Sequence, residues 1–335
     1  MQTLDTFQRP LRDLRISVTD RCNFRCIYCM PKEIFGSDYA YLKKQDVISF
    51  EEITRLARIF VGLGVTKLRL TGGEPLMRRD IENLIEKLAD IAGIEDLALT
   101  TNGSFSPKRV HSLKDAGLRR MTVSLDALDD PTFKAMNDVD FPVQRVLDWI
   151  DASAEIGFQP IKVNMVVQRG INQHSILPMA RYFKDRGHTL RLIEYMDVGN
   201  SNGWRLDEVV PTKTMVETIN AEFPLEAGDA QYRGEVAKRY RYKDGTGEVG
   251  FISSVTQAFC QDCTRLRLAA DGKLFTCLFA VKGHDLWPLL RSGADDHALR
   301  QAIESIWTQR ADRYSEIRAE KTAQKPKIEM SFIGG

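Results

Sequence analysis

One ten-residue stretch, Asp20-Arg21-Cys22-Asn23-Phe24-Arg25-Cys26-Ile27-Tyr28-Cys29, follows a strand-like run and spaces three cysteines as C-x3-C-x2-C. Three thiolates on a tight loop can hold three irons of a [4Fe–4S] cluster and leave the fourth iron open to a substrate, whereas ferredoxin clusters are closed by four cysteines. A zinc site is the alternative, but it takes four ligands, and no histidine or fourth cysteine is near this loop in the sequence. The spacing therefore favours a cluster with an open iron.

The same stretch, with an aromatic residue one position before its last cysteine, resembles the radical S-adenosylmethionine (SAM) superfamily. The resemblance implies that a [4Fe–4S] cluster, whose open iron chelates SAM, is held by Cys22, Cys26 and Cys29. It also implies that one electron from the cluster cleaves SAM to methionine and a 5′-deoxyadenosyl radical, and that Tyr28 contacts the adenine. Such an enzyme needs an external one-electron donor.

The composition is that of an ordinary globular protein. The chain has 335 residues, 43% of them hydrophobic and 28% charged, and a net charge of +1, so no global field attracts nucleic acid or an anionic membrane. Charges run through the N-terminus up to Asp20 where a signal peptide would be apolar, and no stretch approaches the length of a membrane span. We therefore expect a cytoplasmic protein without a membrane or nucleic-acid partner, in which the six cysteines are metal ligands rather than disulfides.

Strand-like and helix-like segments alternate after the cysteine loop. The predicted strands span residues 14–19, 65–71, 96–101, 120–125, 161–168 and 190–195, and the predicted helices span 49–60, 80–91, 107–116, 143–156 and 174–186. Alternation of this kind implies parallel strands joined by crossover helices. We predict an α/β fold with a partial (β/α)6 barrel over residues 6–232, the fold that the resemblance also implies. A β-rich and helical C-terminal region with the second set of cysteines follows over residues 233–335.

The strands present polar residues on one face, which favours a barrel with a polar interior. In the second strand, Lys67 and Arg69 alternate with leucines, as Arg15 does in the first strand and Lys162 in the fifth. Helices must cover the apolar faces, so the polar faces point inward. Barrel interiors are usually packed with Val, Ile and Leu, so a cationic interior predicts a large buried anionic ligand. The alternative is that these charges lie on exposed strand ends.

A second motif, Gly72-Gly73-Glu74-Pro75, follows the second predicted strand. Barrel chemistry is carried out at the carboxyl ends of the strands, so this loop is expected to face the cysteine loop. Two glycines let the backbone approach a ligand closely, although a plain strand-to-helix turn has the same composition. The superfamily resemblance implies that Gly73 and Glu74 contact the amino group of SAM, and that Ser124 and Met196, at two other strand ends, help to hold it.

A second set of three cysteines is spaced C-x2-C-x13-C near the C-terminus: Cys260, Cys263 and Cys277. His284 would complete a Cys3His zinc site, and a second cluster with an open iron is the other interpretation. Arg265 and Arg267 follow on one face of a predicted strand beside the metal, and arginine forks suit phosphate oxygens. A solvated strand face is the plainer explanation of the two arginines.

Together these features resemble the GTP 3′,8-cyclase family of molybdenum cofactor biosynthesis, from about Leu11 to Gly335. The resemblance rests on both cysteine sets and on three stretches: Phe259 to Arg267, Glu194 to Asn200, and the terminal Gly334-Gly335. It implies that the radical abstracts the 3′ hydrogen of GTP. The sugar carbon then bonds to C8 of guanine, and reduction yields (8S)-3′,8-cyclo-7,8-dihydroguanosine 5′-triphosphate.

The family resemblance also implies residue roles. The second cluster would bind guanine through its open iron, and Gly334 and Gly335 would enter the active site and act in catalysis together with Arg15. The positions that match GTP contacts, with Lys67 added from the strand pattern, are Arg15, Lys67, Arg69, Thr100, Lys162, Arg265 and Arg267. The sequence lacks a P-loop, and its G-x-G-x-x-G match at residues 245–250 is flanked by strand-like residues, so we predict a hairpin turn there.

The implied cofactors are two [4Fe–4S] clusters and SAM, with GTP as the substrate. The family also implies a homodimer and cyclic pyranopterin monophosphate synthase as the downstream pathway partner. Two alternatives stay open at this point. Another radical SAM enzyme, such as one that modifies a peptide, can use an auxiliary cluster for electron transfer alone. The other is a zinc-stabilised RNA-binding or regulatory protein, against which the net charge of +1 argues.

Overall fold

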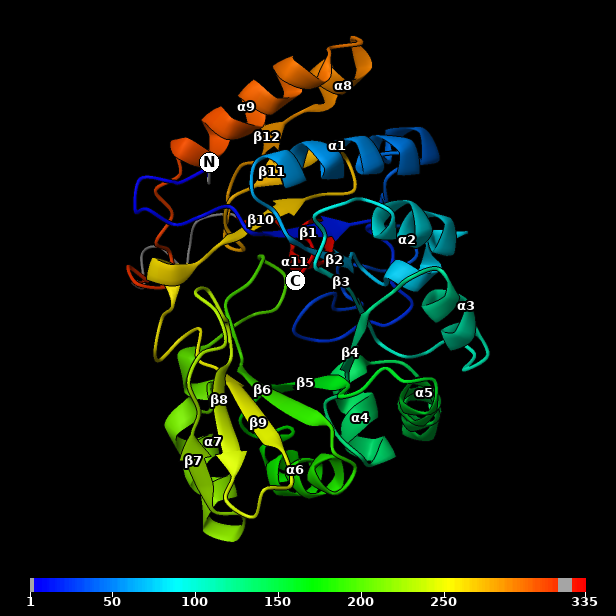
Figure 1. Cartoon of the computed structure of the whole chain (residues 1–335). Coiled ribbons are helices and arrows are strands. Elements are labelled where there is room, and N and C mark those ends of the chain that lie inside the picture. The colour runs from blue at the N-terminus through cyan, green and yellow to red at the C-terminus, as the bar shows by residue number, and fades with distance from the viewer. Residues whose placement is uncertain (1–2, 319–326) are drawn as a thin grey trace.

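The computed structural model describes residues 3–318 and 327–335, which are organised around one sheet of 12 strands. Its centre consists of parallel strands in chain order, each hydrogen-bonded to the next. They are β1 (Asp13–Ser17), β2 (Lys67–Thr71), β3 (Asp96–Thr101), β4 (Arg120–Ser124), β5 (Lys162–Val167) and β6 (Thr189–Glu194). All the predicted strands are thereby confirmed, and they curve into an arc (Figure 1).

The C-terminal part of the chain extends this sheet at both ends. Beside β6 lie the parallel β9 (Glu248–Ile252) and then the antiparallel β8 (Lys238–Tyr242) and β7 (Leu225–Ala227). Beside β1 lie the parallel β10 (Arg265–Leu268) and then the antiparallel β11 (Lys273–Phe275) and β12 (His284–Asp285). The predicted partial barrel is therefore the middle of a longer arc, and the β-rich extension is divided between its two ends.

The G-x-G-x-x-G match begins in the turn between β8 and β9 and continues into β9, and the two strands pair as an antiparallel hairpin. Gly245 and Gly247 in this turn have φ angles of +79° and +138°, which glycine adopts without strain. The predicted hairpin is confirmed.

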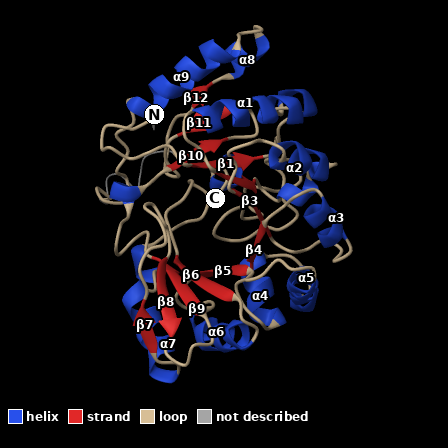
Figure 2. Cartoon of the chain, viewed as in Figure 1, coloured by secondary structure: helices blue, strands red, loops and turns tan. Residues whose placement is uncertain are grey.

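Helices cover the outside of the arc (Figure 2). The predicted helices are confirmed as α1 (Phe50–Gly62), α2 (Ile81–Ala89), α3 (Arg109–Asp115), α5 (Val143–Glu155) and α6 (Ile176–Asp185). A capping box starts α1, because Ser49 Oγ accepts from Glu52 N at 3.1 Å while Glu52 Oε2 accepts from Ser49 N at 2.8 Å. The apolar strand faces, such as Leu68 and Leu70, are buried in one core with the inner faces of these helices.

Two helices were not predicted, α4 (Asp130–Asn137) and α7 (Thr212–Glu222). Pro131 in the first turn of α4 resembles a helix breaker, but proline is tolerated there because the first amides have no intrahelical partner. The buried residues of α7 are Thr212, Met215 and Ile219, a weak apolar pattern. The other helices are α8 (Trp287–Arg291), α9 (Asp296–Thr308) and α11 (Met330–Ile333), with short 3-10 helices at Lys44–Asp46, Pro75–Met77, Gln173–Ser175, Leu206–Glu208 and Cys260–Asp262.

The end of the chain lies inside the arc, where α11 contacts β1 (Figure 1). Ile333 of α11 packs with Ala269 and Phe275 in a small apolar cluster separate from the main core. Within residues 3–318 and 327–335, every helix is too short or too polar to cross a membrane.

Candidate active site

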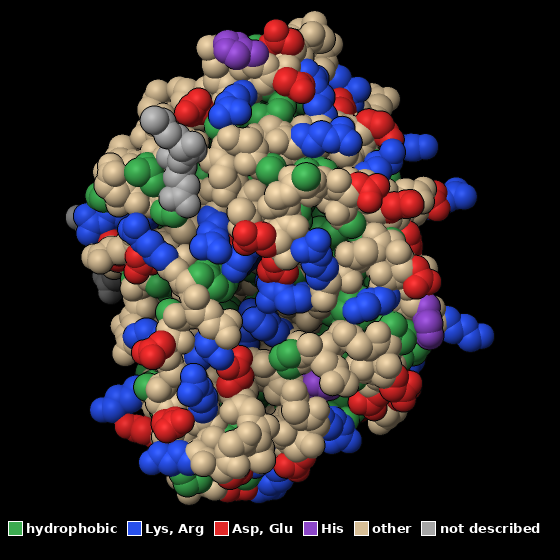
Figure 3. Space-filling model, in the orientation of Figure 1, with side chains coloured by type: hydrophobic (Ala, Val, Ile, Leu, Met, Phe, Trp, Pro, Cys, Tyr) green, Lys and Arg blue, Asp and Glu red, His purple; other side chains and the backbone are tan. Residues whose placement is uncertain are grey.

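A cavity lies on the inner face of the sheet, and Lys and Arg side chains gather around the hollow (Figure 3). All six cysteines line it. So do the other residues singled out from the sequence, apart from Gly334: Arg15, Tyr28, Lys67, Arg69, Gly73, Glu74, Thr100, Ser124, Lys162, Met196, Arg265, Arg267 and Gly335. The polar strand faces point inward as predicted, and they bring together residues from both ends of the chain.

Three arginines lie side by side across neighbouring strands. Arg15 of β1 is level with Arg267 of β10 on one side and with Arg69 of β2 on the other, so all three point to the same face. Burial lowers the pKa of Arg15 well below its usual value, and Arg267, Arg265 and Arg69 lower it further. Buried like charges cost free energy unless an anion joins them. This arginine row therefore favours a polyanionic ligand.

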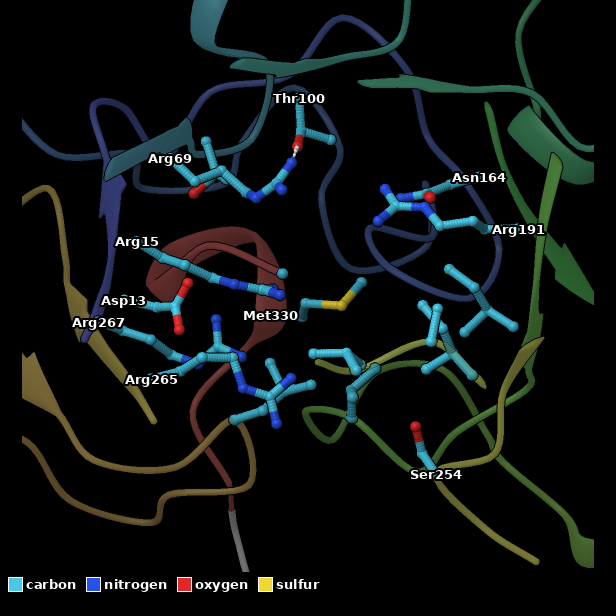
Figure 4. A pocket seen from close by; sticks show the side chains of 18 of the residues that line it. Asp13, Arg15, Arg69, Thr100, Asn164, Arg191, Ser254, Arg265, Arg267 and Met330 are labelled. Atoms are coloured by element: carbon cyan, nitrogen blue, oxygen red, sulfur yellow. Dashed lines mark hydrogen bonds between the residues drawn. The ribbon is translucent and has the colours of Figure 1, made fainter. Parts of the chain in front are cut away.

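A second cationic group, Lys162 of β5 and Arg191 of β6, also lines the cavity, and Figure 4 shows Arg191 beside Asn164. Burial lowers the pKa of Lys162 to about 8, and nearby arginines, Arg191 first among them, lower it further. Arg69 of the arginine row points towards this second group, since its Nη1 donates hydrogen bonds to Thr100 Oγ1 of β3 and Thr122 Oγ1 of β4, each at 3.1 Å. Positive charge therefore lines the cavity on opposite sides.

Arg191 is a lining residue that was not predicted. It is level with Asn164 of β5, and burial, followed by neighbouring arginines, lowers its pKa to about 9. Among the described residues, the buried Arg191 Nε and Asn164 Oδ1 have no hydrogen-bond partner, which fits a polar ligand in the cavity. The signal was present in the sequence, because Arg191 lies between Leu190 and Leu192 in the same alternation that singled out Lys162.

The first cysteine loop is held by two neighbouring segments. Arg25 N donates to Asn137 O at the end of α4 at 2.9 Å, and Asn102 Nδ2, after β3, donates to Asn23 Oδ1 at 2.9 Å. Burial raises the pKa of all three free thiols, and the neighbouring cysteines raise the pKa of Cys26 and Cys29 further. Thiolates in this setting need a cation beside them, and iron supplies one. The loop therefore fits a cluster.

The Gly72-Gly73 turn packs directly on the cysteine loop. Gly73 N donates to Thr19 O and Glu74 N donates to Arg21 O, each at 2.8 Å. A Cβ on Gly73 would lie 2.3 Å from Arg21 O, so a side chain here would force the two loops apart. The close approach that the glycines permit is made to the backbone of the cysteine loop.

The carboxylates of Glu74 and Asp126 accept hydrogen bonds that fix side chains lining the cavity. Glu74 accepts hydrogen bonds from Asn102 N at 2.7 Å and Thr101 Oγ1 at 2.8 Å, and burial raises its pKa to about 7. Tyr28 OH donates to Asp126 Oδ2 at 2.9 Å, and burial raises the pKa of Asp126 to about 7. Glu74 and Tyr28 are thus held in place by hydrogen bonds within the protein.

The second cysteine set is surrounded by arginines from distant parts of the sequence. Cys263 Sγ accepts hydrogen bonds from Arg310 at 3.2 Å and from Arg265 at 3.3 and 3.4 Å. Burial raises the pKa of Cys263, but Arg265 and Arg310 outweigh burial and bring the pKa down to about 6. Arg9 Nη1 donates to Cys260 O at 2.7 Å. Cys263 is therefore prepared as a thiolate, the form that binds iron.

His284, the fourth ligand of the zinc alternative, lies on the edge strand β12 with an exposed side chain. It is outside the cavity lining that contains Cys277. In the part of the chain that the structure describes, no group of three or more His, Cys, Asp or Glu side chains is arranged as the ligands of a single metal ion.

The two cysteine sets lie at opposite ends of the parallel strands. The first follows the carboxyl end of β1, whereas Cys263 precedes the amino end of β10, which is parallel to β1. Cys277 follows β11, which is antiparallel to β10, and so lies at the same end as Cys263. The arginine row therefore lies between two sets of thiols within one cavity.

The last two residues of the chain reach the arginine row. Arg267 Nη1 donates a hydrogen bond to Gly334 O, and Gly335 lines the cavity. Gly334 has a φ angle of +75°, and a Cβ there would lie 2.1 Å from Thr71 Oγ1. Only glycine fits where the chain passes β2.

Comparisons with known proteins agree with this geometry. The Radical SAM superfamily model matches residues 16–183, and the Molybdenum Cofactor Synthesis C model matches residues 188–316. The chain is 51% identical to the GTP 3′,8-cyclase of Acidothermus cellulolyticus, over 99% of this chain and 98% of that protein. It is 50% identical to the GTP 3′,8-cyclase of Staphylococcus carnosus, over 100% of this chain and 99% of that protein. The crystal structure of Streptococcus suis SuiB bound to S-adenosylmethionine shares the fold, with a TM-score of 0.62 and 15% identity over 94% of this chain and 72% of that chain.

Proposed function

Because the chain belongs to the GTP 3′,8-cyclase family within the radical SAM superfamily, we propose that its cavity holds GTP and SAM together between two iron–sulfur clusters. The enzyme carries out the first step of molybdenum cofactor biosynthesis, the conversion of GTP to (8S)-3′,8-cyclo-7,8-dihydroguanosine 5′-triphosphate. Family membership confirms the predicted radical SAM fold and activity. It excludes the zinc-stabilised binding protein and the peptide-modifying enzyme.

The arginine row is the observation that carries the assignment of the substrate site. Arg267, Arg15 and Arg69 are level on three adjacent strands, and Lys162 and Arg191 reach in from the other side. A triphosphate supplies the negative charge that such a group lacks, and arginine forks bind its oxygens in pairs. The full set proposed to contact GTP is Arg15, Lys67, Arg69, Thr100, Lys162, Arg191, Arg265 and Arg267.

The cofactors fit the residues that line the cavity. The first cluster would be held by Cys22, Cys26 and Cys29, and the second by Cys260, Cys263 and Cys277. SAM would be held beside the first by Tyr28, Gly73, Glu74, Ser124 and Met196. When bound, the first cluster and SAM supply the hydrogen-abstracting radical chemistry, and the protein supplies position and charge.

The chain's own residues orient the nucleotide and keep water out. Arg265 and Arg267 lie next to the second cysteine set, so the guanine end is proposed to lie there. The rest of the arginine row, together with Lys162 and Arg191, then neutralises the phosphates across the cavity. Gly334 and Gly335 would close the space beside Arg15, since their lack of side chains lets the tail lie against β2. Enclosure of this kind protects reactive species from solvent.

Other features follow from the family and are proposed with it. The radical SAM core spans residues 6–232, and the region with the second cluster spans residues 233–335. The enzyme works in the cytoplasm as a homodimer, receives electrons from an external one-electron donor and supplies its product to cyclic pyranopterin monophosphate synthase. Sedimentation of the cluster-loaded protein tests the dimer, and a monomeric mass contradicts it.

An anaerobic turnover assay tests the proposed site. Protein with reconstituted clusters is mixed with SAM and dithionite, and 5′-deoxyadenosine and nucleotide products are quantified by mass spectrometry with and without GTP. We expect GTP to increase 5′-deoxyadenosine and to be converted to a cyclised product.

GTP binding should be weakened in each of the variants Arg15→Ala, Arg69→Ala and Arg191→Ala. It should not change in Lys213→Ala, whose side chain is exposed on α7. Unchanged GTP affinity in the three arginine variants contradicts the site.

A further inference from the structure

The loop that follows β6 contacts the C-terminal segment formed by residues 327–335. Met196 at the start of this loop lines the cavity, whereas Asp197 and Asn200 bind Lys327. The function proposed above uses Met196 and gives no role to the rest of the stretch up to Asn200. Val198 lines the cavity, whereas Asp197, Gly199 and Asn200 each contact residues 327–335, which we call the tail.

Asn200 binds the tail backbone as a neighbouring strand would. Its Oδ1 accepts a hydrogen bond from Lys327 N at 2.8 Å, and its Nδ2 donates one to Lys327 O. One amide side chain thereby satisfies both backbone groups of a single tail residue. This pairing sets the position at which the segment enters the fold.

The side chain of Lys327 enters a buried charge cluster centred on Asp197. Lys327 is 4% exposed, and its Nζ donates to Asp197 Oδ2 at 2.8 Å and to Asp197 O at 2.6 Å. Tyr314 OH also donates to Asp197 Oδ2, at 2.5 Å, and Arg318 Nη2 lies 3.0 Å from Asp197 Oδ1. Asp197 therefore contacts the chain on both sides of residues 319–326. A buried carboxylate with several partners is costly to leave unpaired, so the cluster is expected to hold together.

Glu329 makes the third contact with the loop. Its carboxylate accepts hydrogen bonds from Asn200 N at 2.9 Å and from Ser201 Oγ at 2.8 Å. Gly199 has a φ angle of +64°, and a Cβ there would lie 2.1 Å from Glu329 Oε2. Glycine at this position therefore makes room for the carboxylate.

Taken together, these contacts form a tail latch made of Asp197, Gly199, Asn200, Lys327 and Glu329. We propose that the tail latch is what positions the terminal glycines in the cavity, through the short α11 that separates Glu329 from Gly334. The proposal rests on the proposed catalytic role of Gly334 and Gly335. The same loop carries Met196, whose carbonyl accepts from Asn202 Nδ2 at 2.9 Å. The latch residues are positioning residues that act through the tail.

The latch is tested on the cluster-loaded full-length enzyme with Glu329→Ala, Glu329→Gln and Gly199→Ala. Glu329→Ala removes both hydrogen bonds, whereas glutamine can still accept from Asn200 N and pair with Ser201. We expect Glu329→Ala and Gly199→Ala to lower kcat for GTP conversion about tenfold, the factor expected for the loss of a charge-assisted hydrogen bond. The KM for SAM should stay within about twofold, because Met196 is unchanged. Glu329→Gln should recover most of the activity.

Hydrogen exchange distinguishes local release of the tail from a general loss of stability, because a general loss would also increase exchange in the central strands. Backbone amides of residues 330–335 should exchange faster in Glu329→Ala than in the wild type, while those of β1 to β6 stay protected. Glu217→Ala on exposed α7 is the matched control and should change neither exchange nor kcat. Unchanged exchange of the tail in Glu329→Ala, or an equal loss of kcat in Glu217→Ala, overturns the latch. If the wild type does not convert GTP, the proposed function fails, while the exchange experiment still decides whether the latch holds the tail.

Discussion

Lys162 changes its charge within the working pH range because burial, followed by neighbouring arginines, lowers its pKa to about 8. The side chain is an ammonium below that pH and neutral above it, and an ammonium binds phosphate more strongly. We predict that the Kd for GTP rises as the pH increases from about 7 to about 9, because a phosphate with a second pKa of about 6 is already almost fully ionised there. Isothermal titration of the cluster-loaded protein measures this Kd.

Lys162→Arg is the matched variant, because it keeps a positive charge across this pH range. The Kd of this variant for GTP should change less than that of the wild type over the same pH range. A wild-type Kd that does not vary with pH, or that varies equally in the arginine variant, contradicts the role given to the Lys162 charge.

Arg310 illustrates a residue that the sequence could not reveal. It donates to both the sulfur and the backbone carbonyl of Cys263 and is paired with Asp5, but the three are far apart in the sequence. No local spacing connects them, so only the fold brings them together. Arg191, in contrast, could have been predicted from strand alternation alone, as Arg15, Arg69 and Lys162 were.

The contacts of Arg310 predict that replacing it causes loss of the second cluster but not of the first. Arg310→Met removes the cation that stabilises the Cys263 thiolate, so we expect iron to fall from about eight to about four per chain when two four-iron clusters are reconstituted. Iron analysis together with SAM cleavage measures this, and cleavage should persist because the first cysteine set is unaffected. Arg300→Met, which loses a hydrogen bond to Gly62 O at the surface, is the control. Equal iron loss in both variants would rule out a specific role for Arg310.

At the scale of elements, the turn after β2 and the cysteine loop after β1 behave as one unit. Gly73→Ala would place a Cβ 2.3 Å from Arg21 O, where neither backbone can yield without moving the cysteines. We predict loss of the first cluster and of SAM binding, measured by iron content and by equilibrium dialysis of SAM. Gly187→Ala is the control, because its φ of +67° carries similar or greater strain but its Cβ would meet open space among the described residues. Full iron content in Gly73→Ala would refute the packing argument.

The elements also show where pattern reasoning succeeds. The central strands and the helices α1, α2, α3, α5 and α6 have clear periodicity, because each has one face in the core. The pattern failed for α4, where proline occupies a tolerated position, and for α7, whose apolar face is weak. It also could not show that β9 and β10 join opposite ends of the sheet, since strand pairing over such separations depends on the whole fold.

For the whole molecule, this sheet topology predicts that residues 1–232 do not fold alone. Truncation removes β9 and β10, and so exposes the edges of β6 and β1 and the apolar surface that Phe251 and Leu266 cover. We expect the fragment to aggregate in size-exclusion chromatography, whereas the full chain elutes as a defined species. A soluble fragment that unfolds cooperatively would contradict this expectation.

The position of the C-terminus inside the arc has a consequence for how the enzyme is made. β1 cannot pair with β10 before residues 265–268 have been synthesised, and Arg267 cannot bind Gly334 before translation has passed that residue, so this part of the cavity assembles late in synthesis. A stop codon that removes residues 327–335 therefore removes part of the cavity lining. For the same reason, an affinity tag fused directly to Gly335 would begin inside the cavity and compete with its ligands for space.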